Sequence, residues 1–485
     1  MNHRSIVLIN SNRMRPPVGP LALDYVGDRL RAAGFEVRLV DLSFEDDAAI
    51  DKVLAEVDPI AVGVTFRNTD DCYCASGSFF VPALAELVAK IKSQTKAPVV
   101  VGGCGYSIFP AEVLAASGAD LGICGDGEEP FARLATCLQT KDDWRDLPGL
   151  VWPDDVGRRI PNLKFQIVVN PPAYRTVLDV PAPRSLVDNA RYLRQGAMGG
   201  IETKRGCPAQ CIYCADPVAK GRGVRARPAA QVADEIEALL GQGVDVLHMC
   251  DGEFNIPPVH AMAVCEEMIR RGLGESVRWY CYATVHPFPA ELADLMRRAG
   301  CVGINFGADS GCDRMLARLK RGYKRDAIRH AVKYCRKAGL AVMLDLLIGG
   351  PGEDEASVRE SIEFIKQVNP DRAGAATGVR VYPRTALAAL VRQQGPLEHN
   401  PNLRGQVVDN DDFLRPVFYL DRQLGPEPAD LVCDAIGDDE RFFPPPRSSA
   451  AVNYNYNDNR VLTEAIAAGE RGAFWDILRR LADKG

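Results

Sequence analysis

The chain has 485 residues, of which 47% are hydrophobic and 25% are charged, a balance typical of folded proteins that excludes a largely disordered chain. Its formal net charge of -6 predicts no basic surface for nucleic acid or an anionic membrane. No stretch approaches the apolar length of a membrane span, and the apolar run in MNHRSIVLIN is too short for a signal peptide, so we expect a cytoplasmic protein. A chain of this length predicts two or three domains.

Residues 1–140 are expected to form a doubly wound, Rossmann-like parallel sheet. Short β-branched runs alternate there with amphipathic helical stretches, and the runs are SIVLIN, EVRLVDL, IAVGVTF, PVVVGG and DLGICG. Ligands of such sheets bind beyond the carboxyl ends of the strands. We therefore expect the loops NSNRMRPP, RNTDD, GGCGYS and GDGEE to surround one ligand.

The rest of the chain divides into three parts. Residues 141–198 carry scattered prolines and little periodicity, which is typical of a linker. From 199 to 385 the alternation resumes, and six β/α units predict a partial TIM barrel with its chemistry on the loops after the strands. Residues 386–485 have a looser pattern that ends in one amphipathic helix, TEAIAAGERGAFWDILRRLADK, and we expect a C-terminal covering segment of helical and irregular structure.

Three cysteines, Cys207, Cys211 and Cys214, lie in the stretch KRGCPAQCIYCADP after the first strand of the predicted barrel. A structural zinc site needs four ligands, and no further Cys or His follows until His248 and Cys250, in a separate strand. A CxxC redox pair would leave Cys207 without a role. A 4Fe-4S cluster held by three thiolates would account for all three cysteines, and its fourth iron would stay open to a substrate or cofactor. Zinc or coincidental thiols stay open as alternatives.

The C-x3-C-x2-C spacing, with Tyr213 before the last cysteine, resembles the signature of radical S-adenosylmethionine (SAM) enzymes. The resemblance implies that the open iron chelates the amino and carboxylate groups of SAM. The segment CDGE at 250–253 resembles the GGE motif of that family, and GADSG at 307–311 resembles its Gly-x-Glu-Ser segment, with aspartate in place of glutamate. The SAM-binding residues that the resemblance implies are Asp251, Gly252, Glu253, Asp309 and Ser310.

The glycine-rich loops of the first domain resemble those of the cobalamin-dependent (class B) subgroup of that family. The matching segments are VVVGG at 99–103 and GDGEEPF at 125–131, where bare backbone can approach the nucleotide tail of cobalamin. A flavodoxin-like domain that binds another nucleotide stays open as an alternative. The cobalamin-binding residues that the resemblance implies here are Gly102, Gly103, Gly125, Gly127 and Glu128.

Many cobalamin domains of this subgroup carry a histidine that binds cobalt, but residues 10–13 contain none. RNTDD at 67–71 resembles a stretch in histidine-free members, which include tryptophan 2-C-methyltransferase-like enzymes, and this implies that Arg67 and Asn68 bind cobalamin. We hypothesise that Arg67 lies under the corrin and leaves the lower face of cobalt open, because a protonated guanidinium cannot ligate a metal. A salt bridge of Arg67 with Asp70 or Asp71 is the alternative.

The family resemblance implies a methyltransferase that depends on a 4Fe-4S cluster, SAM and cobalamin. It would move a methyl group from SAM via methylcobalamin to a carbon of a small molecule, such as a tryptophan-like amino acid or a natural-product precursor. A low-potential electron donor such as ferredoxin or flavodoxin would be its partner. A non-methylating cyclisation or rearrangement is the alternative, and radical and polar methyl transfer both stay open. Tyr280, Tyr282, His286 and Tyr382 lie near strand ends, but the sequence identifies no catalytic base.

Overall fold

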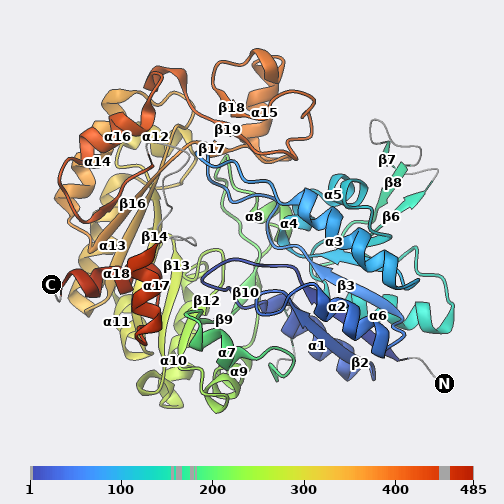
Figure 1. Cartoon of the computed structure of the whole chain (residues 1–485). Helices are drawn as coiled ribbons and strands as arrows, with labels where there is room; N and C mark the ends of the chain where they lie inside the picture. The colour runs from blue at the N-terminus through green and yellow to red at the C-terminus, as the bar shows by residue number, and fades with distance from the viewer. Residues whose placement is uncertain are drawn as a thin grey trace. The chain divides into compact units, whose positions relative to one another are not determined.

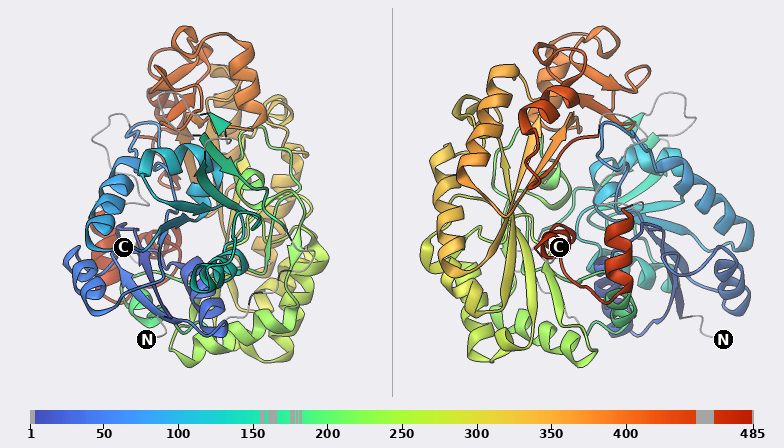
Figure 2. Two further views of the ribbon diagram at one scale, coloured as in Figure 1. Left: turned by 90° about the vertical axis from the view of Figure 1, so that its right-hand side faces the viewer. Right: turned by 60° about the vertical axis from the view of Figure 1, so that its left-hand side comes forward.

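The computed structural model describes residues 4–154, 158–159, 166–174, 178, 180, 183–446 and 459–483. It divides the chain into two compact units, which Figure 1 and the two views of Figure 2 show. The first unit comprises residues 1–71, 78–188 and 215–221, and the second comprises residues 72–77, 189–214 and 222–485. No helix in the described part of the chain is long and apolar enough to cross a membrane.

The first unit is built on a sheet with the strand order β2-β1-β3-β4-β5-β6-β8-β7. The parallel strands are β1 (Ser5–Asn10), β2 (Glu36–Asp41), β3 (Ala61–Thr65), β4 (Val99–Gly102) and β5 (Leu121–Ile123). The main helices between and after them are α1 (Leu21–Ala32), α2 (Ala48–Glu56), α3 (Val81–Gln94), α5 (Pro110–Ser117) and α6 (Glu128–Thr140). The predicted doubly wound parallel sheet is confirmed, because strands buried on both faces read as continuous apolar runs.

Strands from the segment between the two predicted sheets extend the first one. β6 (Leu150–Asp154) pairs antiparallel with β5, and β8 (Gln166–Val169) pairs antiparallel with β6. β7 (Arg158–Arg159) pairs with β8. Part of the segment that we expected to be a linker therefore belongs to a sheet. The sequence pattern of β6 is hard to recognise as a strand because Leu150, Val151 and Trp152 are all buried. It therefore lacks the alternation of apolar and polar residues that marks a half-exposed strand.

The second unit is built on a seven-stranded sheet with the order β20-β16-β15-β14-β13-β12-β9. Its six successive parallel strands are β9 (Gly199–Ile201), β12 (Val246–Met249), β13 (Arg278–Ala283), β14 (Cys301–Asp309), β15 (Ala341–Ile348) and β16 (Arg372–Thr377). The helices that follow them include α9 (Ala229–Gly241), α10 (Pro258–Arg270), α11 (Ala290–Arg298), α13 (Arg325–Ala338) and α14 (Glu355–Val368). Figure 1 labels five of these six strands, β9, β12, β13, β14 and β16, and the predicted partial barrel is confirmed.

The barrel strands have two different faces. Alternate residues, such as Phe306 of β14 and Leu344 of β15, belong to the large apolar core that the sheet shares with its helices. The residues between them lie on the opposite, inner face of the barrel. Near the amino ends of the strands, the inner face carries a separate apolar cluster that includes Tyr280, Met343 and Trp475. We call this cluster the barrel floor.

The C-terminal segment supplies part of that floor. Its elements include α15 (Ala386–Gln393), α16 (Pro428–Ile436), β20 (Phe442–Phe443), α17 (Arg460–Ala467) and α18 (Phe474–Ala482). We predicted one final helix, but α17 and α18 are separate, because Gly469 and Gly472 adopt positive φ values between them. α18 carries Trp475, whose ring centroid lies 6.2 Å from that of Tyr280. Residues 447–458 and 484–485 of this segment lie outside the described residues.

Candidate active site

The three cysteines lie on a loop between β10 (Lys204–Arg205) and α8 (Asp216–Lys220). Ile212 anchors this loop in the second unit. Its backbone nitrogen donates to the Leu319 oxygen at 3.2 Å, and its backbone oxygen accepts from the Leu387 nitrogen at 2.8 Å. Its side chain is buried in an apolar cluster that also contains Leu319 and Leu387. The apolar residue between Cys211 and Cys214 therefore fixes the loop and leaves these two thiols partly exposed.

Arg321 is a buried cation beside the cysteine loop. Its Nη1 lies 2.9 Å from Sγ of Cys211 and 3.2 Å from the hydroxyl oxygen of Tyr213. Its Nη2 donates to the Gly307 oxygen at 2.6 Å, and 6% of the side chain is exposed. A guanidinium in this position stabilises negative charge on the sulfur. Sequence reasoning missed Arg321, because the run KRGYKR that contains it is indistinguishable from a basic surface loop.

Asp309 and Ser310, at the end of β14, face different neighbours. The Asp309 carboxylate accepts a hydrogen bond from the Tyr213 hydroxyl and lies 3.1 Å from Nε of Arg321. Burial raises the pKa of Asp309, and Arg321 and Tyr213 oppose that rise. Ser310 is directed elsewhere, because its Oγ lies 2.8 Å from Oγ of Ser361 in α14. Asp309 thus connects the strand end to the cysteine loop, and Ser310 connects it to the helix layer.

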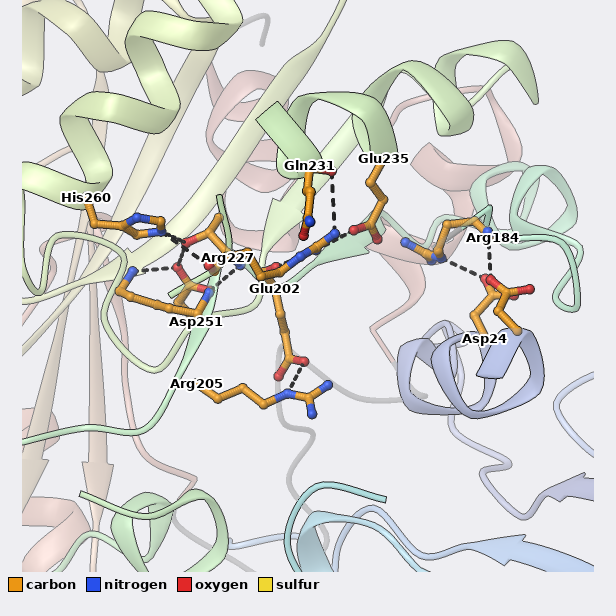
Figure 3. A network of polar contacts seen from close by, with 12 residues as sticks. Asp24, Arg184, Glu202, Arg205, Arg227, Gln231, Glu235, Asp251 and His260 are labelled. Atoms are coloured by element: carbon orange, nitrogen blue, oxygen red, sulfur yellow. Dashed lines mark hydrogen bonds and ion pairs between the residues drawn. The ribbon is translucent and has the colours of Figure 1, made fainter. Parts of the chain in front are cut away.

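Asp251 has its hydrogen-bonding capacity filled by protein groups. One carboxylate oxygen accepts from the backbone nitrogens of Thr203 at 2.7 Å and Lys204 at 3.2 Å, and the other lies 2.6 Å from Lys204 Nζ. His260 Nε2 contacts the Thr203 oxygen at 3.2 Å, and burial lowers the pKa of that histidine. Figure 3 shows Asp251 and His260 close together at one end of the contacts drawn there. With 2% of its surface exposed, Asp251 holds the start of the cysteine loop in place.

Two further ion pairs support the same strand end. Arg205 Nε donates to a carboxylate oxygen of Glu202 at 2.8 Å, and Arg227 pairs with Glu235 of α9 (Figure 3). Arg227 Nη1 also donates to the Glu202 backbone oxygen at 2.8 Å. Buried pairs of this kind fix geometry because breaking one leaves an uncompensated charge.

Glu253 lies beside Arg321. Its Oε1 is 4.0 Å from Nη2 of Arg321, and 18% of its side chain is exposed. The residues of the GGE-like segment therefore divide in the structure: Asp251 is enclosed by protein groups, whereas the Glu253 carboxylate lies close to the arginine that contacts Cys211.

The donor set of the cysteine loop fits an iron–sulfur cluster. Within the described ranges, no three or more His, Cys, Asp or Glu side chains converge as the ligands of one metal ion would. A 4Fe-4S cubane is larger than an ion and takes thiolates that are spread around it. Three thiols on one loop, with a buried guanidinium next to Cys211, match that requirement.

The glycine loops of the first unit are linked by Ser107. Its Oγ donates to the Gly103 oxygen at 2.8 Å and lies 3.0 Å from the Gly125 nitrogen, which donates to it. Gly103 has a φ of 114°, and a Cβ there would lie 2.7 Å from the Phe66 oxygen, so a side chain does not fit. Sequence reasoning missed Ser107 as a residue of this site, although it lies in the segment GGCGYS that we expected to face the ligand.

The loop after β5 leads into α6 through Gly127. Among the described residues, a Cβ at Gly127 would come within 4 Å of Val26 alone, at 3.8 Å, so the backbone of Gly127 stays accessible to a close neighbour. Glu128 is buried in the first turn of α6. Gly102 at the end of β4 and Gly103 after it, together with Gly125 and Gly127 here, form a surface of bare backbone at the carboxyl ends of two strands, which fits the tail of a nucleotide.

Arg67 follows β3 and its side chain is exposed. Its Nη1 lies 3.8 Å from Sδ of Met14, and Arg67 forms no ion pair with any residue that the structure describes. The alternative salt bridge with Asp70 or Asp71 is therefore not formed. The loop after β3 therefore carries a guanidinium that pairs with no carboxylate among the described residues.

Residues 201–365 of the chain match the Radical SAM superfamily, and residues 10–135 match the B12 binding domain. The chain is also similar over its whole length to TsrM, a radical SAM methyltransferase from Kitasatospora setae whose structure holds a tryptophan substrate and a SAM analogue. The identity is 30%, the match covers 99% of both chains, and the TM-score is 0.88. The chain belongs to the cobalamin-dependent radical SAM methyltransferases.

Two more comparisons agree with this family. A second TsrM structure, with cobalamin and a 4Fe-4S cluster bound, matches with a TM-score of 0.89 and 29% identity over 99% of this chain and 98% of that one. The tryptophan 2-C-methyltransferase of Streptomyces laurentii is 29% identical over 97% of this chain and 95% of its own length. As a member of the family, the protein is a methyltransferase that depends on a 4Fe-4S cluster, SAM and cobalamin, as the sequence resemblance implied.

Proposed function

We propose that this methyltransferase transfers a methyl group from SAM to a ring carbon of tryptophan or of a closely similar small molecule. The observation that carries the proposal is the similarity to TsrM, which extends over 99% of both chains and therefore includes the C-terminal segment that lies outside the two matched domains. Substrate specificity usually lies in such segments and in loops at strand ends. A relative that shares them supports a shared substrate class.

The proposal assigns the cofactors to the residues described above. Cys207, Cys211 and Cys214 would hold the cluster, with Arg321 balancing the charge of the thiolates. Gly252 and Glu253 would contact the amino group of SAM, because a carboxylate pairs with an ammonium group. The contacts of Asp309 and Ser310 with SAM stay predictions, and Asp251 would act by holding the loop.

Cobalamin would be held by the backbone of Gly102, Gly103, Gly125 and Gly127, with Glu128 in the adjoining helix turn. Bound there, it supplies a cobalt centre that can carry a methyl group between SAM and the substrate. Arg67 and Asn68 would lie at its lower face, where a guanidinium offers no lone pair to the metal. A low-potential electron donor such as ferredoxin or flavodoxin would keep these cofactors reduced, and we expect the reaction to take place in the cytoplasm.

The test uses the full chain, purified and loaded with iron, sulfide and cobalamin under anaerobic conditions, then supplied with SAM, tryptophan and a low-potential reductant. We expect tryptophan to gain one CH2 by mass and S-adenosylhomocysteine to form. A protein with all three loop cysteines changed to alanine should give neither product. Absence of 5'-deoxyadenosine would indicate a polar route, and its formation a radical one. Unchanged tryptophan with the loaded wild-type protein would refute the proposed substrate.

A further inference from the structure

A polar pair, Asn305 and Asp345, lies on the inner face of the barrel, and no assignment above uses it. Asn305 of β14 donates from Nδ2 to Oδ2 of Asp345 of β15 at 2.9 Å. Their neighbours in the strands, Phe306 and Leu344, belong to the core on the helix side, so the alternation of the strands directs the pair into the barrel.

Glycines surround this pair, and a side chain on two of them would collide with Asp345 or with the barrel floor. Asp345 pairs in register with Gly374 of β16, and a Cβ at Gly374 would lie 2.3 Å from Oδ1 of Asp345. On β14, Asn305 has Gly303 and Gly307 as its neighbours on the same face. A Cβ at Gly303 would meet Trp475 of the barrel floor at 2.9 Å, and one at Gly307 would meet Arg321 at 3.6 Å. The pair therefore lies between the floor and the arginine that contacts Cys211.

Both members of the pair have unused hydrogen-bond acceptors. Asn305 is 8% exposed, and its Oδ1 is buried without a hydrogen-bond partner. Asp345 accepts from Asn305 alone and pairs with no cation in the described part of the chain, although its side chain stays partly accessible. Burial raises the pKa of Asp345 to about 6, which reflects how little the protein compensates its charge. Unpaired acceptors of this kind are costly unless a ligand supplies the donors.

The aromatic ring of Tyr282 lies on the strand next to Asn305. Tyr282 of β13 is in register with Asn305, and 50% of the residue is exposed. Its ring centroid lies 5.0 Å from that of His248 in an edge-to-face arrangement. An exposed ring beside two acceptors suits a ligand that combines an aromatic body with a hydrogen-bond-donating nitrogen.

We propose that Asp345 and Asn305 bind the hydrogen-bond-donating nitrogen of the methyl-accepting substrate, with Tyr282 against its aromatic ring. The inference rests on the proposed function and adds the residues that select the substrate. An ammonium group and an indole N–H share the required chemistry, because both are hydrogen-bond donors: the first has enough hydrogens for the Asp345 carboxylate and Oδ1 of Asn305, and the second would donate its single hydrogen to the carboxylate. The floor below the pair would limit how far the substrate enters the barrel.

Calorimetric titration of the full chain, loaded with cluster and cobalamin, tests this inference. We expect Asp345→Asn to weaken L-tryptophan binding by about tenfold or more, because a charge-assisted hydrogen bond is lost, and to leave SAM binding unchanged. Asn305→Leu should weaken tryptophan binding in the same direction. Asp371→Asn is the matched control, because this exposed carboxylate accepts from the Val342 nitrogen at 2.8 Å near the other end of β15. Melting temperatures establish that each variant is folded.

Two tryptophan analogues show which of its nitrogens, the ammonium group or the ring N–H, binds Asp345. N-acetyl-L-tryptophan lacks the ammonium group, and the benzofuran analogue of tryptophan lacks the ring N–H. We expect one of them to bind the wild-type protein as weakly as tryptophan binds Asp345→Asn. If both bind the wild-type protein as tightly as tryptophan does, the pair holds no nitrogen and the inference is wrong.

The remaining outcomes separate this inference from the proposed function. Unchanged tryptophan binding by Asp345→Asn overturns the inference alone if the wild-type protein methylates tryptophan. Weakened SAM binding in that variant also overturns it, because the pair would then serve the cofactor. A wild-type protein that neither binds nor methylates tryptophan overturns the proposed function together with the inference.

Discussion

Nη1 of Arg321 lies 2.9 Å from Sγ of Cys211, so a buried guanidinium contacts the middle cysteine of the loop. The same guanidinium lies 3.1 Å from the Asp309 carboxylate through Nε, which connects the loop to the end of β14. Arg321 thus contacts the sulfur of a cysteine that is 110 positions away in the chain. Burial raises the pKa of the Cys211 thiol, and the positive charge of Arg321 opposes that rise and so supports the thiolate form that holds iron.

Replacing Arg321 by glutamine should lower the iron and sulfide content after anaerobic reconstitution. It should also lower stability by about 3 kcal/mol, because Asp309 would keep a buried charge without its cation. Metal analysis and thermal melts measure the two effects. Arg325→Gln, which removes a surface arginine 2.8 Å from Glu360, should change neither. A full iron content in Arg321→Gln would refute the role assigned to the guanidinium.

Replacing the two carboxylates of the 251–253 segment by amides should have different effects on SAM binding and on stability. Glu253→Gln should weaken SAM binding by about tenfold with little change in melting temperature, because a charge-assisted contact is lost from a partly exposed group. Asp251→Asn should instead lower stability by about 3 kcal/mol, since Lys204 Nζ loses its buried carboxylate. SAM titration and thermal melts distinguish the two results. A stable Asp251→Asn protein with weakened SAM binding would show that Asp251 binds SAM directly.

Gly127→Ala tests the backbone cradle for cobalamin. The φ of Gly127 is -93°, and its Cβ would meet only Val26 at 3.8 Å, so the variant should fold like the wild-type protein. We expect it to retain several-fold less cobalamin after gel filtration, measured by corrin absorbance, because the added methyl group keeps the ligand from the backbone. Gly241→Ala in α9, where a Cβ would meet nothing within 4 Å, is the control and should retain normal cobalamin.

Arg67→Ala should alter the absorption spectrum of bound cobalamin and slow methyl transfer, because an unneutralised guanidinium is removed from the loop expected beneath the corrin. Arg38→Ala, which breaks an exposed contact of 3.0 Å with Glu36, should leave both unchanged. Identical spectra and turnover for Arg67→Ala and the wild-type protein would remove the hypothesis that this residue lies under cobalt.

Glu353 makes stability depend on pH. Burial raises its pKa from 4.5 to about 7, although the Gly349 and Gly350 nitrogens donate to its carboxylate. Between these two pH values the folded state binds more protons than the unfolded state, so this residue's contribution to stability is lost as pH rises through that window. Glu353→Gln should therefore melt above the wild-type protein at pH values above about 7, with the difference shrinking toward pH 5. A constant difference across that range would contradict the assignment.

Local patterns in the sequence determined the architecture and the kinds of cofactor. Alternating apolar runs predicted both sheets, because a buried parallel strand and the amphipathic helix after it each leave a periodic signal. The spacing of Cys207, Cys211 and Cys214 predicted an incomplete ligand set, because three thiols on one short loop are local by nature. The glycines after β4 and β5 could also be predicted, since a positive φ such as that of Gly103 excludes most other residues.

The tertiary structure alone decided which side chains meet. Sequence reasoning treated Asp251 and Glu253 alike, but contacts with Thr203 and Lys204 enclose the first, and the second lies beside Arg321. The pairing of Asn305 with Asp345 depends on the register between two strands, which a shift of one residue would abolish. A sequence pattern reports the period and polarity of its own segment. Hydrogen bonds between segments 40 or 110 positions apart arise only when strand register and loop anchoring bring those segments together.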